Sequence, residues 1–149
     1  MPSCAFCNLS SQRKKEDHRC LDDSAHHYVI LDKSPKVKGH TLVISKKHYP
    51  DVTRLDAVES RRLLAAVIRW SKTLQVKPGC EKVYLMSMCD HWDPSERSLQ
   101  SPETTEHLHM QLFPRYKEDR AWRGEVYFCR PPRQVTRNEL RRTKERLLS

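Results

Sequence analysis

Residues 107–113, His107-Leu108-His109-Met110-Gln111-Leu112-Phe113, alternate between polar and apolar side chains. This alternation is the pattern of a half-buried β-strand. Side chains two positions apart share one face of a strand, so the two histidines and Gln111 line up while the aliphatic side chains point inward. Two imidazoles and a carboxamide on one edge of a sheet can bind a metal or attack phosphorus. Pro114 is expected to end the strand, because it has no N–H to donate to a neighbouring strand.

The composition is typical of one domain with a small core, since 37% of the 149 residues are hydrophobic and 32% are charged. Dimerisation would enlarge that core. No apolar run reaches the roughly 20 residues of a membrane span, and the start Met-Pro-Ser-Cys does not resemble a signal peptide. We therefore expect a soluble, cytoplasmic protein, or in a eukaryote also a nuclear one, with no membrane partner. Six cysteines in such a chain indicate thiols or a metal site rather than disulfides.

The formal charge of +9 favours anionic partners, from nucleotides to nucleic acids. Much of this charge lies late in the chain, since residues 115–149 hold 11 Lys/Arg against 5 Asp/Glu. Such a basic tail is either a solvated helix or a surface that docks nucleic acid through its phosphates. Phosphate attraction would depend on salt and carry no sequence information.

Apolar patterns along the chain predict an α+β fold with an antiparallel sheet of about five strands. The strands are expected at residues 28–31, 40–45, 82–88, 107–113 and 125–129. One long helix is expected to begin after Asp56, with Glu59 suited to a capping box, and to stop at Pro78-Gly79. A second capping box from Thr136 to Glu139 opens a basic terminal helix. Residues 1–130 are expected to form the domain, and residues 131–149 a basic helical tail.

Cys4-Ala5-Phe6-Cys7 places two thiols across a tight turn. Two thiolates at this spacing can hold Zn²⁺ when two neutral imidazoles complete a tetrahedral Cys₂His₂ set. A redox pair is the alternative, but such a motif opens a helix after a strand, and no strand is expected before residue 4. Two unligated cysteines near a frayed terminus are the third interpretation.

Three segments, taken in order, resemble the histidine-triad (HIT) superfamily. They are Asp32-Lys33-Ser34-Pro35, Gly39-His40-Thr41-Leu42-Val43-Ile44-Ser45-Lys46-Lys47-His48, and the stretch from His107 to Arg115. The family signature is His-φ-His-φ-His-φ-φ, where φ is apolar, usually followed by Pro-Arg. Zinc-bearing members also carry an early Cys-X-X-Cys. The resemblance covers roughly residues 4–116, and it implies a HIT-like fold and a homodimer.

The resemblance also implies a metal site and a nucleophile. The zinc ligands in similar proteins match Cys4, Cys7, His48 and His107, and the zinc would be structural, bracing the strand. The family nucleophile matches His109, which would form a covalent nucleotidyl-histidine intermediate. Activity of this kind covers nucleotide hydrolases, phosphorylases and nucleotidyltransferases.

The expected ligand is a nucleotide or a nucleotide conjugate. Asp32 matches the acidic residue that binds the ribose hydroxyls in similar proteins, although an Asp before Ser-Pro is also common in turns. Ile30 and Leu31 are expected to flank the base or to belong to the core. Thr104 stands where the family places a hydroxyl near the phosphates.

Two departures from the family pattern bear on activity. Gln111 replaces the third histidine, and a carboxamide cannot act as a general acid near neutral pH. Similar proteins with glutamine there are nucleotidyltransferases or phosphorylases, which favours a leaving group that is stable unprotonated. Residues 101–106 replace the glycine-rich segment before the triad, and His91 in the preceding loop is a candidate substitute acid. The alternative is a degenerate module that senses nucleotides or docks nucleic acid or protein without catalysis.

Overall fold

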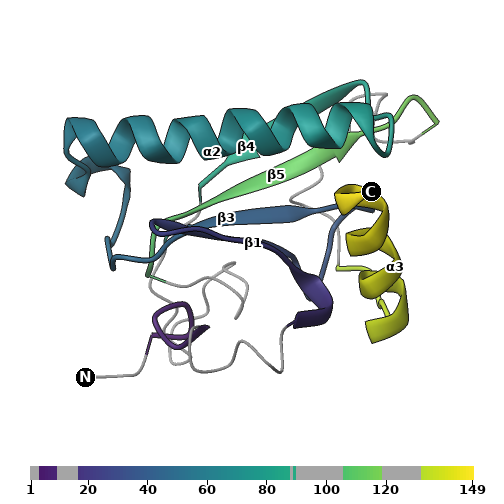
Figure 1. The fold of residues 1–149 in the computed structure, drawn as a ribbon, viewed down its shortest axis with the longest axis horizontal. Coiled ribbons are helices and arrows are strands. Elements are labelled where there is room, and N and C mark those ends of the chain that lie inside the picture. Colours follow the sequence, from purple (N-terminus) through teal and green to yellow (C-terminus); the bar gives the residue numbers. More distant parts are fainter. Residues whose placement is uncertain (1–3, 10–16, 88, 90–105, 119–131) are drawn as a thin grey trace, which may run out of the picture.

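The computed structural model describes residues 4–9, 17–87, 89, 106–118 and 132–149. These residues form one sheet flanked by two α-helices (Figure 1). The helices are α2 (Ala57–Val76) and α3 (Arg137–Leu148), and two short 3₁₀ turns are η1 (Asp17–Arg19) and η2 (Val52–Arg54). The strands are β1 (Cys20–Asp23), β2 (His27–Leu31), β3 (Thr41–Ser45), β4 (Lys82–Met86) and β5 (His109–Arg115).

The five strands form an antiparallel sheet in the order β1-β2-β3-β5-β4. The histidine-bearing strand β5 therefore lies inside the sheet, with β3 on one side and β4 on the other. His109 lies opposite Ile44 of β3, and Gln111 lies opposite Leu42 of β3 and Met86 of β4. We call β5 the triad strand, because it carries His109 and Gln111 of the family-like motif. Pairing on both sides suits a strand whose side chains have to be held in fixed positions.

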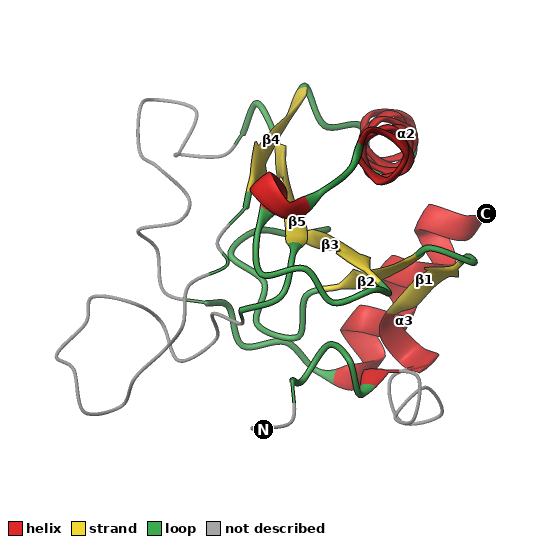
Figure 2. Cartoon of the chain, turned by 90° about the vertical axis from the view of Figure 1, so that its left-hand side faces the viewer, coloured by secondary structure: helices red, strands yellow, loops and turns green. Residues whose placement is uncertain are grey.

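The two larger of three hydrophobic clusters among the described residues cover the two faces of the sheet. The larger cluster joins α2 to one face through Leu63, Val67, Trp70 and Leu74, and it also takes in Leu140 and Leu147 of α3. The smaller cluster covers the opposite face with Leu9 and Phe6 from the N-terminal turn (Figure 2). The basic terminal helix is thus packed against the domain through its apolar face.

The expected elements at 28–31, 40–45 and 82–88 match β2, β3 and β4, and the long helix begins after Asp56 as expected. The Asp56 carboxylate accepts the N–H groups of Val58 and Glu59, while the Glu59 carboxylate pairs with Arg62. The Thr136 capping box of α3 is present. The expected strand at 125–129 lies outside the described residues, as do His91, residues 101–105 and Thr104.

Two features differ from the expectations. Strand β1 is absent from the sequence prediction, because Cys-Leu-Asp-Asp is a poor strand sequence, and its pairing with β2 through an irregular register holds it in the sheet. The expectation that Pro114 ends the strand is wrong, since β5 continues to Arg115. The last β3 pair is Leu112 with Thr41, so Pro114 pairs only with β4, at a position where its missing N–H costs no bond to β3.

None of the helices in the described ranges combines the length and the apolar character that a membrane crossing requires.

Candidate metal centre and triad strand

The polar face of the triad strand is fully covered, which differs from the half-buried strand that the sequence predicts. His107 is 0% exposed, His109 3% and Gln111 7%. The N-terminal turn contributes to this coverage of the histidines, because its Phe6 ring lies edge-on to both, at 5.7 Å from His107 and 5.1 Å from His109 between ring centroids. Leu108 and Leu112 point into the opposite cluster, as expected.

The structure brings together the four predicted metal ligands from three distant parts of the chain. The ligand atoms of Cys4, Cys7, His48 and His107 all lie within 4.8 Å of one another. Nδ1 of His107 lies 3.2 Å from Cys4 Sγ, 3.5 Å from Cys7 Sγ and 3.1 Å from His48 Nδ1. Tetrahedral zinc, at about 2.0–2.3 Å from nitrogen and sulfur ligands, sets neighbouring ligand atoms about 3.3–3.8 Å apart. The donor set and its spacing therefore form a structural zinc site of the Cys₂His₂ type.

A second contact fixes His107 in the form that a metal needs. Its Nε2–H donates to the carbonyl of Ser45, at 2.7 Å, at the end of β3. This bond leaves Nδ1 with a free lone pair directed at the thiols, which is the usual arrangement for a ligating histidine. Burial lowers the pKa of His107, so the ring is neutral near pH 7.

The ring of His109 is oriented by the chain itself. Its Nδ1–H donates to the carbonyl of His107, at 2.8 Å, so Nε2 is the nitrogen that carries the lone pair. Burial lowers the pKa of His109, and this effect exceeds the opposing influences of the His107 carbonyl and of Asp32. A neutral imidazole with an unprotonated Nε2 is the form that attacks an electrophile.

Gln111 is held by His40, a residue of the family-like segment to which the sequence assigns no role. Nε2–H of His40 donates to Oε1 of Gln111 at 3.1 Å, and the His40 ring stacks on Phe113 at 4.2 Å. On its other side, Nδ1 of His40 accepts the N–H of Lys36 and lies 3.5 Å from the Asp32 carboxylate. Burial lowers the pKa of His40 although Asp32 opposes the shift, so His40 is a neutral donor to Gln111.

The three nucleotide-binding candidates among the described residues do not all lie on one face of the sheet. Asp32 lies 3.5 Å from His40, which donates to Gln111, and the charge of Asp32 also acts on His109. Ile30 packs on the triad face of the sheet with Leu42, whereas Leu31 belongs to the opposite cluster under α2. Adjacent residues of a strand point to opposite faces, so Ile30 and Leu31 cannot both contact one side of a base. The sequence places both residues next to each other in one predicted strand, and this adjacency already indicates that they lie on opposite faces.

We predict that the purified chain holds one zinc ion, and that His48→Ala loses it. Removing zinc with a chelator should lower the midpoint of thermal unfolding by about 5–10 °C. A free zinc concentration of about 100 times Kd stabilises the folded state by about 2.7 kcal/mol. Metal content by plasma mass spectrometry and a thermal scan measure both effects. His26→Ala is the matched control, because His26 is an exposed histidine outside the cluster. Equal zinc content in the two variants would contradict the assignment.

Comparison with known proteins identifies a family. The model of the HIT domain family matches residues 13–118. An uncharacterised HIT-like protein from Methanocaldococcus jannaschii is 27% identical over 125 residues, which are 83% of this chain and 84% of that protein. An uncharacterised HIT-like protein from Mycoplasma genitalium is 28% identical over 123 residues, with 80% and 78% covered.

Solved structures share the fold. A HIT-like protein involved in cell-cycle regulation from Bartonella henselae superposes with a TM-score of 0.71 at 17% identity, covering 99% of this chain and 96% of that one. A zinc-bound histidine triad family protein from Mycobacterium smegmatis gives a TM-score of 0.68 at 24% identity, covering 97% and 93%. Since the family model spans most of the chain and the sheet and helices agree, this chain belongs to the HIT domain family.

Proposed function

We propose that this chain is a nucleotide-binding enzyme that passes a nucleoside monophosphate through a covalent intermediate on Nε2 of His109. One observation carries the proposal, the 2.8 Å hydrogen bond from Nδ1 of His109 to the His107 carbonyl. It fixes the tautomer, and burial keeps the ring neutral. A neutral nucleophile with an unprotonated Nε2 can divide one difficult displacement at phosphorus into two easier ones.

The two steps balance without any change of oxidation state. The lone pair of Nε2 forms a bond to the α-phosphorus, and the bond from phosphorus to the leaving oxygen breaks, so that the leaving group takes the electron pair. In the second step an acceptor oxygen attacks the same phosphorus, the P–N bond breaks, and the imidazole returns to its neutral form. The proton of the acceptor passes to solvent or to a basic group on the bound acceptor.

Gln111 favours nucleotidyl transfer or phosphorolysis over a hydrolysis that releases a basic leaving group. With its Oε1 occupied by His40, the free part of the carboxamide is its NH₂ group, which can donate to a phosphoryl oxygen but supplies no proton. The leaving group then has to be stable as an anion, as a phosphate is. The substrate classes that fit are dinucleoside polyphosphates and nucleotide sugars, ahead of nucleoside phosphoramidates.

We further propose that Asp32 binds the ribose. Its side chain is 17% exposed, and one carboxylate oxygen accepts the N–H of Ser34 at 2.7 Å. The second oxygen retains acceptor capacity for a hydroxyl group. Thr104 stays a proposed phosphate contact, and Ile30, on the triad face, is the better candidate for a base contact than Leu31.

Zinc has a positioning role in this proposal. The four ligands are Cys4, Cys7, His48 and His107, which leaves no ligand position for a substrate in a tetrahedral site. The ion would fasten the N-terminal turn and the segment after β3 to the residue that orients His109. Substrate activation would come from the chain's own donors.

A second candidate function rests on the coverage of His109. His109 is 3% exposed and the Phe6 ring lies edge-on to it, so in this proposal substrate access depends on movement of the N-terminal turn. A chain in which that turn stays closed would be a nucleotide sensor, or a docking module that uses the basic helix α3, without catalysis. Nucleotide binding with no covalent adduct would favour this candidate.

We predict that His109→Ala lowers turnover by about 10³-fold or more, because it removes the group that forms the intermediate. Intact-protein mass spectrometry after brief incubation with nucleotide substrates should show a nucleoside monophosphate adduct in the wild type and none in the variant. Zinc content and thermal midpoint should not change. His26→Ala serves as the control, and full activity in His109→Ala would exclude the mechanism.

We predict that Gln111→His changes the preference among leaving groups. A histidine there can protonate an amine or alkoxide, and general acid catalysis contributes about 10²–10⁴-fold. The rate for a nucleoside phosphoramidate should therefore rise by about 10²-fold relative to the rate for a dinucleoside polyphosphate. Gln111→Ala, which adds no acid, should lower both rates. If Gln111→His left the ratio of the two rates unchanged, the role given to Gln111 would be wrong.

We also propose a homodimer through α2 and the edge strand β4. These neighbouring elements expose large apolar side chains, among them Ile68 and Leu85, which are 46% and 49% exposed. Among the described strands β4 lies at an edge of the sheet, and an edge strand with apolar neighbours is a pairing surface. Light scattering should give a dimer mass for the wild type and a monomer mass for Ile68→Glu/Leu85→Glu. Val76→Glu, at the end of α2, should stay dimeric, and a monomeric wild type would refute the interface.

A further inference from the structure

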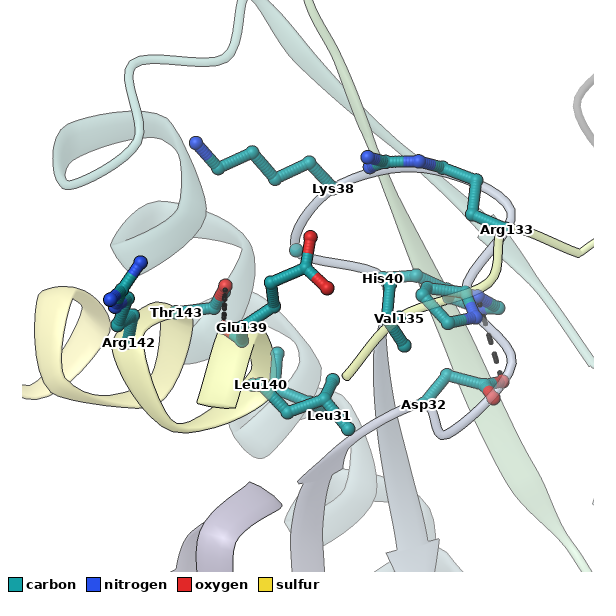
Figure 3. Close-up of a pocket in the computed structure, with 12 residues that line it drawn as sticks. Leu31, Asp32, Lys38, His40, Arg133, Val135, Glu139, Leu140, Arg142 and Thr143 are labelled. Atoms are coloured by element: carbon teal, nitrogen blue, oxygen red, sulfur yellow. Dashed lines mark hydrogen bonds and ion pairs between the residues drawn. The ribbon is translucent and has the colours of Figure 1, made fainter. Parts of the chain in front are cut away.

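A cavity of about 250 Å³ lies between the segment that follows β2 and the terminal helix α3 (Figure 3). Leu31, Val135 and Leu140 give it apolar walls, and they lie together in the close-up. Lys38, Arg133 and Arg142 stand around the rest of the cavity. The proposed function uses Asp32 and His40 from this lining but gives no role to its cationic side chains.

The cavity is built by packed elements. The backbone N–H of Arg133 donates to the carbonyl of Pro35 at 2.8 Å, which joins the segment before α3 to the segment after β2. Leu140 and Leu147 anchor the helix in the main cluster, where they are 7% and 3% exposed. Its walls are therefore held in place from both sides, as a preformed binding site requires.

The charges in the cavity favour an anion. Three cationic and two acidic side chains line it, and Asp32 lies 3.5 Å from neutral His40. The hydrogen bonds from Thr136 lower the pKa of Glu139, and the charges of Arg133 and Arg142 help to lower it. Asp32 accepts the Ser34 N–H, and Glu139 accepts the N–H and the hydroxyl of Thr136. Within the described part of the chain, Lys38, Arg133 and Arg142 make no ion pair within 4 Å. Two guanidinium groups and an ammonium group that make no close ion pair with the described residues match the oxygens of a phosphate.

The cavity is connected to the triad strand by two contacts. Gln111 of β5 accepts from His40, and His40 lies 3.5 Å from Asp32. Both His40 and Asp32 line the cavity. A ribose held at Asp32 would therefore have the triad strand on one side and the cationic cavity on the other.

We propose that this cavity is a second phosphate subsite, which binds a phosphate on the ribose 2′- or 3′-oxygen of the nucleotide whose α-phosphate faces His109. This inference rests on the proposed function, because it places one ligand across both sites. The ligand class is a nucleoside 3′,5′-bisphosphate or its 2′ isomer, either free or as the first unit of a 5′-phosphorylated oligonucleotide. The apolar walls offer a surface for the next base of an oligonucleotide.

The test is calorimetric binding to the full-length, zinc-loaded His109→Ala chain, in which no turnover occurs. Nucleoside 5′-monophosphates are compared with the matching 3′,5′-bisphosphates and 2′,5′-bisphosphates and with 5′-phosphorylated dinucleotides. The second phosphate should strengthen binding about tenfold at low salt. Tighter binding of the dinucleotide than of the bisphosphate would identify an oligonucleotide end as the source, and equal binding a free bisphosphate.

Charge variants of the His109→Ala chain test whether the cavity causes the gain in affinity that the second phosphate brings. Arg133→Gln/Arg142→Gln should remove it, and Glu139→Gln, which keeps an acceptor for Thr136, should increase it several-fold. Arg141→Gln is the matched control, because Arg141 lies on α3, pairs with Glu145 and does not line the cavity. Truncation of the tail would not serve, since it would remove buried Leu140 and Leu147.

Two results would overturn the inference. One is equal affinity for the mono- and bisphosphates, and the other is a gain that survives Arg133→Gln/Arg142→Gln unchanged. The proposed function can fail separately. A charge-dependent gain in binding, together with no covalent adduct on wild-type His109, would remove the reaction and support the subsite.

Discussion

The position of His107 is the constraint on which the rest of the site depends. Its Nδ1 lies among the Cys4, Cys7 and His48 ligand atoms, its Nε2–H donates to the Ser45 carbonyl, and its own carbonyl accepts from His109. One residue thus joins the N-terminal turn, the end of β3 and the triad strand. A histidine ring that donates from one nitrogen presents a lone pair on the other. The bond to Ser45 therefore leaves Nδ1 of His107 for the metal, and the bond to the His107 carbonyl leaves Nε2 of His109 with a lone pair. The metal site and the proposed nucleophile, His109, are parts of one arrangement.

Much of the fold and the whole ligand set could be predicted from the sequence. Alternation in residues 107–113 predicts a strand and its two faces, although β5 itself runs from His109 to Arg115. Asp56 and Thr136 mark the beginnings of the helices. Cysteines three apart indicate a metal, but only the family resemblance links them to His48 and His107, which lie far away in the chain. Coordination is local in space and distant in sequence, so spacing alone does not identify a ligand set.

The remaining features come from tertiary packing. The coverage of His109 depends on Phe6, more than 100 residues away, and the continuation of β5 through Pro114 depends on where β3 stops pairing. His40 has no pattern that separates a buried donor from an ordinary strand residue. The cavity beside Asp32 exists because α3 folds back onto the domain, which its basic character alone does not predict.

Nitrogen-15 NMR of the histidine side chains in the zinc-loaded protein at pH 7.5 reports the protonation state of both rings. We predict that His109 is neutral, with its proton on Nδ1 and an unprotonated Nε2. We also predict that His107 carries its proton on Nε2 and that its Nδ1 shift changes when zinc is removed. A His109 ring that is charged, or that carries its proton on Nε2, would contradict the proposed arrangement of the site.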